Sequence, residues 1–269
     1  MAAKGKADHK VEELISRVLN NLHERGAREL AAWKKPGDDL HLLVKADYVR
    51  KLRRHLNYRQ LKDLVEAFGR IFPSLNRRPL GIMSVEACSK VAKKLQFHFK
   101  AAPYTGQEGL ALRGFYVTRS QGMLKQPLMY VNTAHHRLAV MSTFCHELGH
   151  HVSSELFGFS EEPIHFFFDA DYIAHLEEPS ELAADVMVSL SGYPAEAARK
   201  IFATEWNWGL VARAQNMTDE AFEDVRNHLK KAYGFDLMER LPADRRLHYL
   251  LGMIHYAKLR WALLAEYDI

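Results

Sequence analysis

The sequence predicts an α+β fold that is mostly helical, with a small, mainly antiparallel sheet beside one histidine-bearing helix. Three observations support this prediction. Apolar residues recur at helical spacing over long stretches at both ends of the chain. Three short segments between residues 95 and 132 have the composition of strands and are separated by turns that contain Gly or Pro. The sequence His146-Glu147-Leu148-Gly149-His150 follows these segments within a further helical pattern.

Composition limits the possible classes of protein. The chain has 269 residues, of which 48% are hydrophobic, so it can bury one large core or two small ones. Its start is polar and lacks the apolar segment of a secretory signal, and no apolar run approaches the ~18 residues of a membrane span. Cys88 and Cys145 are the only cysteines, which argues against a disulfide framework. We therefore expect a cytoplasmic protein with no membrane partner.

The N-terminal part of the chain is expected to be helical. One helix should begin near Val11 and end near Trp33, and a second should cover Ala46 to Ile71 with a break near Asn57. The composition changes after Pro79, which places a boundary there. We expect four regions: a disordered tail (1–9), an N-terminal helical region (10–79), a catalytic core (80–192) and a C-terminal helical region packed on the core (193–269).

The core should begin with a helix for which Ser84 is the N-cap. The expected strands follow at 95–100, 112–120 and 128–132. The next helix carries apolar residues from 138 to 152, and Gly158 is suited to end it. A further helix should start at Pro179-Ser180, because proline fits a first helical turn. The chain from Pro194 to Ile269 has a helical pattern throughout, and its last helix begins near Asp244.

His146 and His150 have a spacing typical of a metal site. Residues four apart lie on one face of a helix, so both imidazoles can reach a single Zn²⁺. Glu147 leaves the helix at a different angle and is placed to act as a general base on a metal-bound water. A chance histidine pair on an ordinary helix is the alternative, so the pair alone remains a hypothesis.

A third metal ligand is expected downstream. Glu181 and Asp185 are also four residues apart on one predicted helix. Glu181 can complete the ligand set, and Asp185 can accept the free ring N–H of a ligating histidine. Other candidates for the third ligand are His151, His165, His175, Glu177 and Glu178. Of these, His151 should point away from the site, toward a supporting contact or toward solvent.

Gly149 is an unexpected residue within this helix. Glycine inside a helix costs roughly 1 kcal/mol relative to alanine, so it needs a reason. A substrate strand or another backbone approaching the site closely would provide one. Packing of a second helix against the glycine would provide another, and the sequence does not decide between them.

Residues 80 to 190 resemble the ImmA/IrrE family of zinc metallopeptidases, which belongs to the gluzincin group. The expected strands, His146-Glu147-Leu148-Gly149-His150 and Glu181-Leu182-Ala183-Ala184-Asp185 carry the resemblance. It implies a zincin-type active-site helix in an intracellular protease, often one that cleaves a transcriptional repressor. His146, His150 and Glu181 would be the metal ligands and Glu147 the base. The family often has Asn in place of Asp185, and either side chain can accept an imidazole proton.

The expected reaction is hydrolysis of a peptide bond in an intracellular protein. Glu147 would assist attack by a zinc-bound water and then deliver the proton to the leaving amine. The oxyanion needs a second donor, and the candidates are Tyr172, His165 and His175. Ordinary packing in an aromatic-rich segment is the alternative role of each. We expect an extended substrate to add to the edge of the strand at 128–132.

A basic segment gives a competing hypothesis. Residues 45–78 contain ten Lys and Arg against three acidic residues, a local net charge of +7. The segment could bind DNA or a DNA-bound repressor, although a solvated helical face is the simpler explanation and direct nucleic-acid binding is not favoured. The competing function is a DNA- or protein-binding regulator with a structural or inactive metal site.

Overall fold

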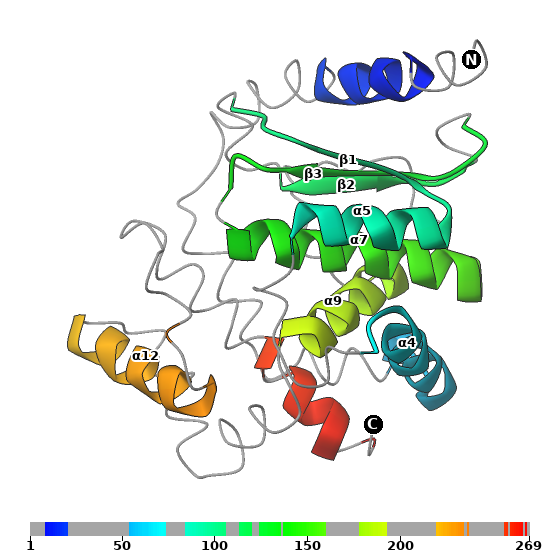
Figure 1. The fold of residues 1–269 in the computed structure, drawn as a ribbon. Helices are drawn as coiled ribbons and strands as arrows, with labels where there is room; N and C mark the ends of the chain where they lie inside the picture. Colours follow the sequence, from blue (N-terminus) through cyan, green and yellow to red (C-terminus); the bar gives the residue numbers. More distant parts are fainter. Residues whose placement is uncertain are drawn as a thin grey trace. The chain divides into compact units, whose positions relative to one another are not determined.

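The protein is described here by a computed structural model, which is mostly helical with a small three-stranded sheet (Figure 1). The structure describes residues 9–20, 54–73, 84–105, 113–119, 124–135, 137–159, 178–192, 219–233, 236, 256–257, 259–265 and 267. The predicted α+β class is confirmed at this level. No helix among these residues is both long enough and apolar enough to cross a bilayer.

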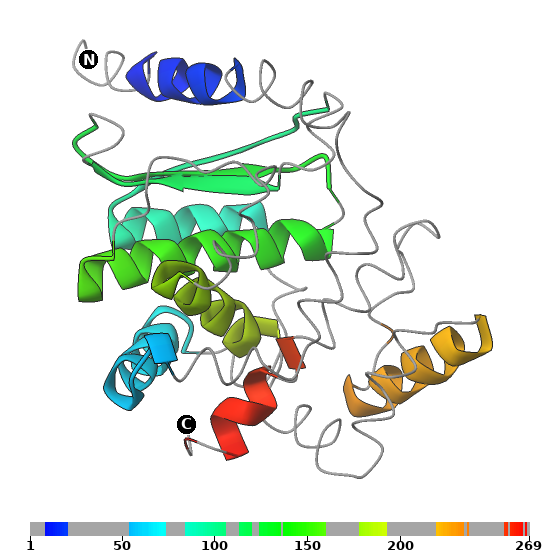
Figure 2. The same ribbon diagram turned by 180° about the vertical axis from the view of Figure 1, so that it is seen from behind.

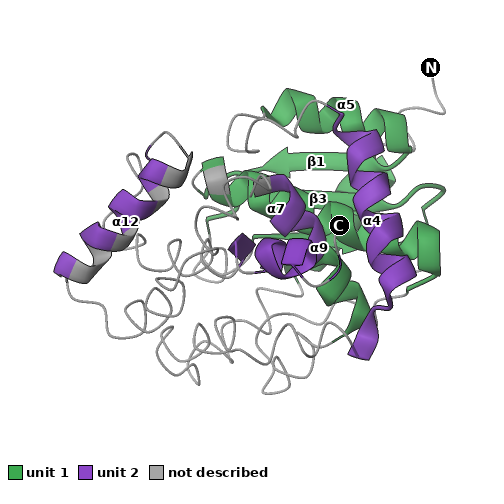
Figure 3. Cartoon of the chain, turned by 90° about the horizontal axis from the view of Figure 1, so that it is seen from below, with its two compact units in different colours: residues 1–33, 80–184 green, residues 34–79, 185–269 purple. Residues whose placement is uncertain are grey.

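The chain separates into two compact units (Figure 3). Unit 1 combines Met1–Trp33 with Leu80–Ala184, and unit 2 combines Lys34–Pro79 with Asp185–Ile269. Each unit therefore consists of two segments that are distant in sequence. The four regions predicted above are continuous segments, and they stay a prediction.

Unit 1 is built in layers around its sheet (Figures 1 and 2). A helix over residues 9–20 covers one face. Helices α5 (Val85–Leu95) and α7 (Arg137–Phe157) cover the other face, where α5 contacts strand β1 and α7 contacts strands β2 and β3. The sheet thus supports α7, the helix that carries the histidine pair.

The sheet is mixed, which corrects the expectation of a mainly antiparallel one. Strands β1 (His98–Ala102), β2 (Gly114–Val117) and β3 (Leu128–Asn132) lie in the order β1-β3-β2. Strand β3 is antiparallel to β2 but parallel to β1. Strand β2 lies between β1 and β3 in the sequence, although β1 and β3 are neighbours in the sheet. The connection from β1 to β3 therefore crosses through β2, and the two strands do not form a hairpin.

The order of the strands also changes which strand can receive a peptide. Strand β3 has a neighbour on both sides, so the expectation that a substrate adds to its edge is wrong. Of the three described strands, β1 and β2 are at the edges, and β2 together with β3 contacts α7. All five residues of β3 are buried, as is typical of a strand covered on both faces.

Alternating side chains of the sheet face the two helical layers. The buried cluster on one face joins the 9–20 helix to β2 and β3. Its members are Val11, Leu14, Ile15, Val18, Phe115, Val117, Leu128 and Tyr130. Because side chains alternate along a strand, Gly114 and Tyr116 of β2 lie on the opposite face, toward α7.

Local capping signals place several helix ends where the sequence predicts them. Ser84 caps α5 by accepting a hydrogen bond of 3.2 Å from the amide of Ala87. Asn57 caps α4 (Tyr58–Ile71) and forms a reciprocal capping box with Gln60, which explains the expected break. Helix α7 ends before Gly158, whose φ of +67° favours glycine.

The remaining described helices belong to the C-terminal half. Helix α9 runs from Pro179 to Gly192, so its predicted start is confirmed. Helix α12 covers Asp219–Tyr233, and the described residues between 256 and 267 are helical. Other parts of the expected helices, including residues 21–33 and 46–53, lie outside the described residues.

Candidate metal centre

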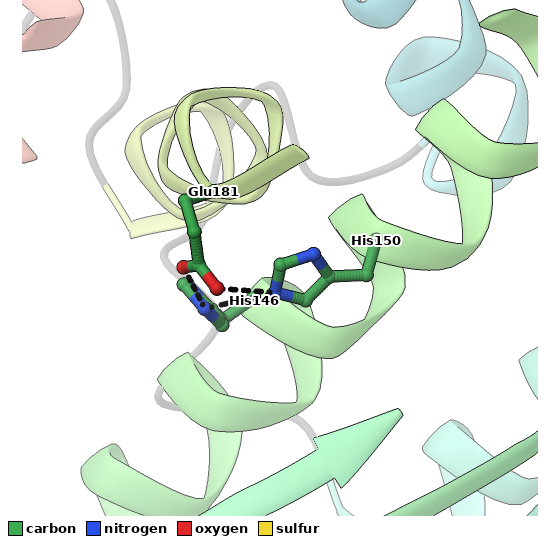
Figure 4. Close-up of side chains that lie close together, drawn as sticks. All are labelled: His146, His150 and Glu181. Carbon is green, nitrogen blue, oxygen red and sulfur yellow. Dashed lines mark hydrogen bonds and ion pairs between the residues drawn. The ribbon is translucent and has the colours of Figure 1, made fainter. Parts of the chain in front are cut away.

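Helix α7 carries functional side chains on two different faces. His146 and His150 are one turn apart and point toward the start of α9 (Figure 4). Glu147 follows His146 directly, and its carboxylate points toward β2 instead. One helix therefore places a potential ligand pair and a separate carboxylate side by side.

Glu181 of α9 meets both histidines (Figure 4). Its Oε2 lies 3.1 Å from Nε2 of His146, and its Oε1 lies 3.6 Å from Nε2 of His150. The two Nε2 atoms are themselves 3.1 Å apart. His150 and Glu181 are buried, whereas His146 is partly exposed. The three predicted ligands are thus brought together, and they could hold a metal ion.

The distances between the ligand atoms fit a small tetrahedral cation. Zinc bonds to nitrogen or oxygen are about 2.0–2.1 Å long, so two ligands of a tetrahedral ion are roughly 3.3–3.4 Å apart. Nε2 of His146 lies 3.1 Å from Nε2 of His150 and 3.1 Å from Oε2 of Glu181, both close to this value, while Nε2 of His150 lies 3.6 Å from the other carboxylate oxygen, Oε1. Two imidazole nitrogens and a carboxylate form a donor set that zinc prefers, and three protein ligands leave one position open.

Gly149 allows α9 to approach α7 closely. A Cβ atom added at Gly149 would lie 2.4 Å from Cα of Ala184 and 3.1 Å from its main-chain nitrogen. The partner is the backbone of α9, which cannot rotate away. The approaching backbone is that of a second helix, so helix packing explains this glycine, and that helix is also the one that brings Glu181 to the site. Ala184 follows Glu181 by less than one helical turn. The close contact between Gly149 and Ala184 therefore determines how near the Glu181 carboxylate lies to the two histidines.

Glu147 is buried against the main chain of β2. A Cβ added at Gly114 would lie 3.3 Å from Oε1 of Glu147, 2.6 Å from Cγ2 of Thr143 and 2.7 Å from the carbonyl oxygen of Tyr130. The glycine therefore lets the strand pack directly on α7 beside this carboxylate. Sequence reasoning missed Gly114, although an isolated glycine within a strand pattern signals a close backbone approach.

His151 is buried, so it does not face solvent. Its Nδ1 lies 3.0 Å from the hydroxyl of Tyr116 on β2, and its ring packs against Phe97 at a centroid distance of 4.8 Å. Burial lowers the pKa of His151, although Glu155 and a hydrogen bond to the Leu95 backbone oppose that shift. The neutral ring can accept from Tyr116 and donate to Leu95. His151 is not a member of the group that could hold a metal ion.

Asp185 is buried one turn after Glu181 on α9. Its Oδ1 accepts a hydrogen bond of 3.3 Å from the hydroxyl of Tyr256. Sequence reasoning did not anticipate this partner, which is 71 residues away along the chain. The expected role of Asp185 in orienting a ligating histidine stays a prediction.

Several predicted site residues lie outside the described part of the chain: His165, Tyr172, His175 and Glu177. Glu178 is described and precedes α9, but it does not belong to the ligand group found there. The basic side chains described between 45 and 78 are exposed, as expected for a solvated face. They are Arg54, Arg59, Lys62 and Arg70.

Neither cysteine is suited to act as a nucleophile. Cys88 and Cys145 are both buried thiols. Burial raises the pKa of Cys88 to about 12, and its sulfur contacts that of Met141 at 3.9 Å. A thiol must ionise to be reactive, so Cys88 is a packing residue.

No protein-family model matches this chain, and no curated protein or solved structure shows significant similarity to it. The resemblance to the ImmA/IrrE family therefore remains an interpretation of the residues that carry it. The group of His146, His150 and Glu181, which could hold a metal ion, is seen in the structure and does not depend on this resemblance.

Proposed function

We propose that the protein is a zinc-dependent endopeptidase of ImmA/IrrE type that cleaves an intracellular protein. The observation that carries the proposal is the convergence of His146, His150 and Glu181 within one ligand group, with Glu147 on an adjacent face of the same helix. A bound zinc ion would supply a Lewis acid that polarises a water molecule and the scissile carbonyl. The protein side chains would perform the remaining steps.

Glu147 is the proposed general base. It would take a proton from the attacking water and deliver it to the leaving amine. Its carboxylate does not belong to the group that could hold the metal ion, so it would not be a metal ligand. Burial beside the Gly114 main chain limits its motion, and a fixed base needs little reorganisation during the reaction.

Strand β2 is the proposed support for an extended substrate. It is an edge strand among the three described, and its Gly114 lies against the proposed base. A peptide could add to this edge through main-chain hydrogen bonds, which bind many sequences. The resemblance suggests a transcriptional repressor as the substrate. In the competing function, a DNA- or protein-binding regulator, the same ligand group would have a structural role.

The ligand assignment predicts the metal content of a variant. Purified wild-type protein should contain about one zinc per chain, and His150→Ala should lose most of it because two remaining ligands bind far more weakly than three. Elemental analysis after gel filtration would measure both. His98→Ala, on strand β1, is a matched control and should keep its zinc. Unchanged zinc in His150→Ala would contradict the assignment.

A chelator experiment tests the activity itself. Wild-type protein should cleave candidate repressors, removal of zinc should stop cleavage, and added zinc should restore it. The cleaved bonds can be identified by mass spectrometry of new N-terminal peptides. A protein that binds zinc but cleaves none of these substrates would favour the regulator.

Three variants test whether Asp185 orients a ligating histidine. If it orients a ligating histidine, Asp185→Ala should weaken zinc binding or activity by about 10–100-fold. Asp185→Asn should be milder, because its amide oxygen still accepts an N–H. Tyr256→Phe should show whether the observed hydrogen bond contributes to this effect. Zinc titration would measure all three, and wild-type affinity and activity in Asp185→Ala would exclude the role.

A further inference from the structure

The face of α7 that meets β2 contains more than the proposed base. Thr143, Glu147 and His151 are each one turn apart and lie on that face. The ligands His146 and His150 point toward Glu181 instead (Figure 4). Contacts made by β2 can therefore affect Glu147 without touching the ligand atoms.

Strand and helix match in spacing along this face. Gly114 and Tyr116 are two residues apart on β2, a distance of about 6.6–6.8 Å along a strand. Glu147 and His151 are four residues apart on α7, about 6 Å along a helix. The Gly114 main chain meets Glu147, and the Tyr116 hydroxyl meets His151. Together these two contacts fix the position of β2 along the axis of α7.

The Tyr116–His151 contact is specific as well as buried. Tyr116 is 3% exposed and His151 is 4% exposed, and their polar atoms are 3.0 Å apart. A buried hydroxyl or imidazole that loses its partner pays the full cost of its desolvation. A sliding movement of β2 along α7 would break this hydrogen bond, whereas apolar contacts would tolerate it.

We propose that Tyr116 and His151 are positioning residues whose hydrogen bond holds β2 in the register that keeps Gly114 against Glu147. The effect on catalysis rests on the proposed function. The effect on the strand does not, because it concerns only how β2 is held on α7.

Tyr116→Phe tests the inference by removing one hydroxyl while keeping the ring. Tyr130→Phe is the matched control, since the Tyr130 hydroxyl donates to the Ala102 carbonyl at 2.9 Å and its ring packs in the cluster on the other face of the sheet. Hydrogen exchange of peptides covering residues 113–119 should be about five-fold faster in Tyr116→Phe, which corresponds to one lost hydrogen bond. Tyr130→Phe should leave that segment unchanged.

Kinetics on a quenched fluorescent peptide that the wild type cleaves provide the second measurement. Tyr116→Phe should lower kcat about ten-fold because the base is misplaced, with KM and zinc affinity unchanged. Tyr130→Phe should alter none of these. His151→Asn, which retains an acceptor near the position of Nδ1, should preserve more activity than His151→Leu.

The outcomes separate the two proposals. Wild-type exchange at 113–119 in Tyr116→Phe would overturn the positioning role, as would equal effects of the two tyrosine variants. Faster exchange confined to Tyr116→Phe would support the role even if the zinc-loaded wild type cleaves no peptide. In that case the proposed function alone would fail.

Discussion

Glu147→Gln should retain zinc and the native fold but lose at least about 10²–10⁴-fold in peptide hydrolysis, the usual contribution of a general base. The amide has nearly the same shape as the carboxylate, and it cannot accept a proton at neutral pH. Because Glu147 is outside the ligand group, elemental analysis should find the wild-type amount of zinc. Initial cleavage rates of the zinc-loaded proteins would measure the loss.

Glu155→Gln is a control for this substitution. Glu155 lies two turns later on α7, where it forms a half-exposed ion pair of 3.5 Å with Arg119. An exposed pair contributes little, so this variant should cleave at the wild-type rate. If Glu147→Gln also cleaved at that rate in a preparation free of other proteases, a different group would have to be the base.

The helices that carry the site could be predicted because their signals are local. Gly158 ends α7 and Pro179 begins α9, and each acts through its own backbone preference. The ligand pair of α7 follows from helical spacing alone. Whether this pair meets Glu181 depends on how α7 and α9 pack, which local sequence does not show. The structure places the three side chains together.

The sheet was predicted less well because strand pairing depends on distant residues. Three strands were expected and the described residues contain three, but nothing within β1 specifies a parallel partner 30 residues away at Leu128. The continuous apolar character of β3 is a signal that could have indicated a central strand.

The burial of His151 and its hydrogen-bond partner could not be predicted from local sequence, because they depend on tertiary packing. Its position after His150 predicts that it leaves the ligand face, but not whether it reaches solvent or core. Its Nδ1 forms a hydrogen bond with the hydroxyl of Tyr116, which is 35 positions earlier in the chain. Gly149 was ambiguous for the same reason, since the backbone that it contacts belongs to another helix.

Gly149→Ala should weaken zinc binding by at least about ten-fold and destabilise the fold by about 1–3 kcal/mol, as overpacking of a tight contact does. Its new Cβ would have to displace the α9 backbone, because no real Cβ lies 2.4 Å from a Cα. Displacing α9 draws the Glu181 carboxylate away from the two histidines. Zinc titration and urea unfolding would measure the two effects.

Gly69→Ala gives the opposite result if this reasoning is correct. Gly69 lies within α4, and a Cβ added there would meet nothing within 4 Å. The substitution should therefore stabilise the protein by about 0.5–1 kcal/mol through helix propensity and leave zinc affinity unchanged. Both variants change glycine to alanine inside a helix, so only the packing differs. If Gly149→Ala also bound zinc like the wild type and gained stability, close approach of α9 would not be what holds Glu181 in the ligand group.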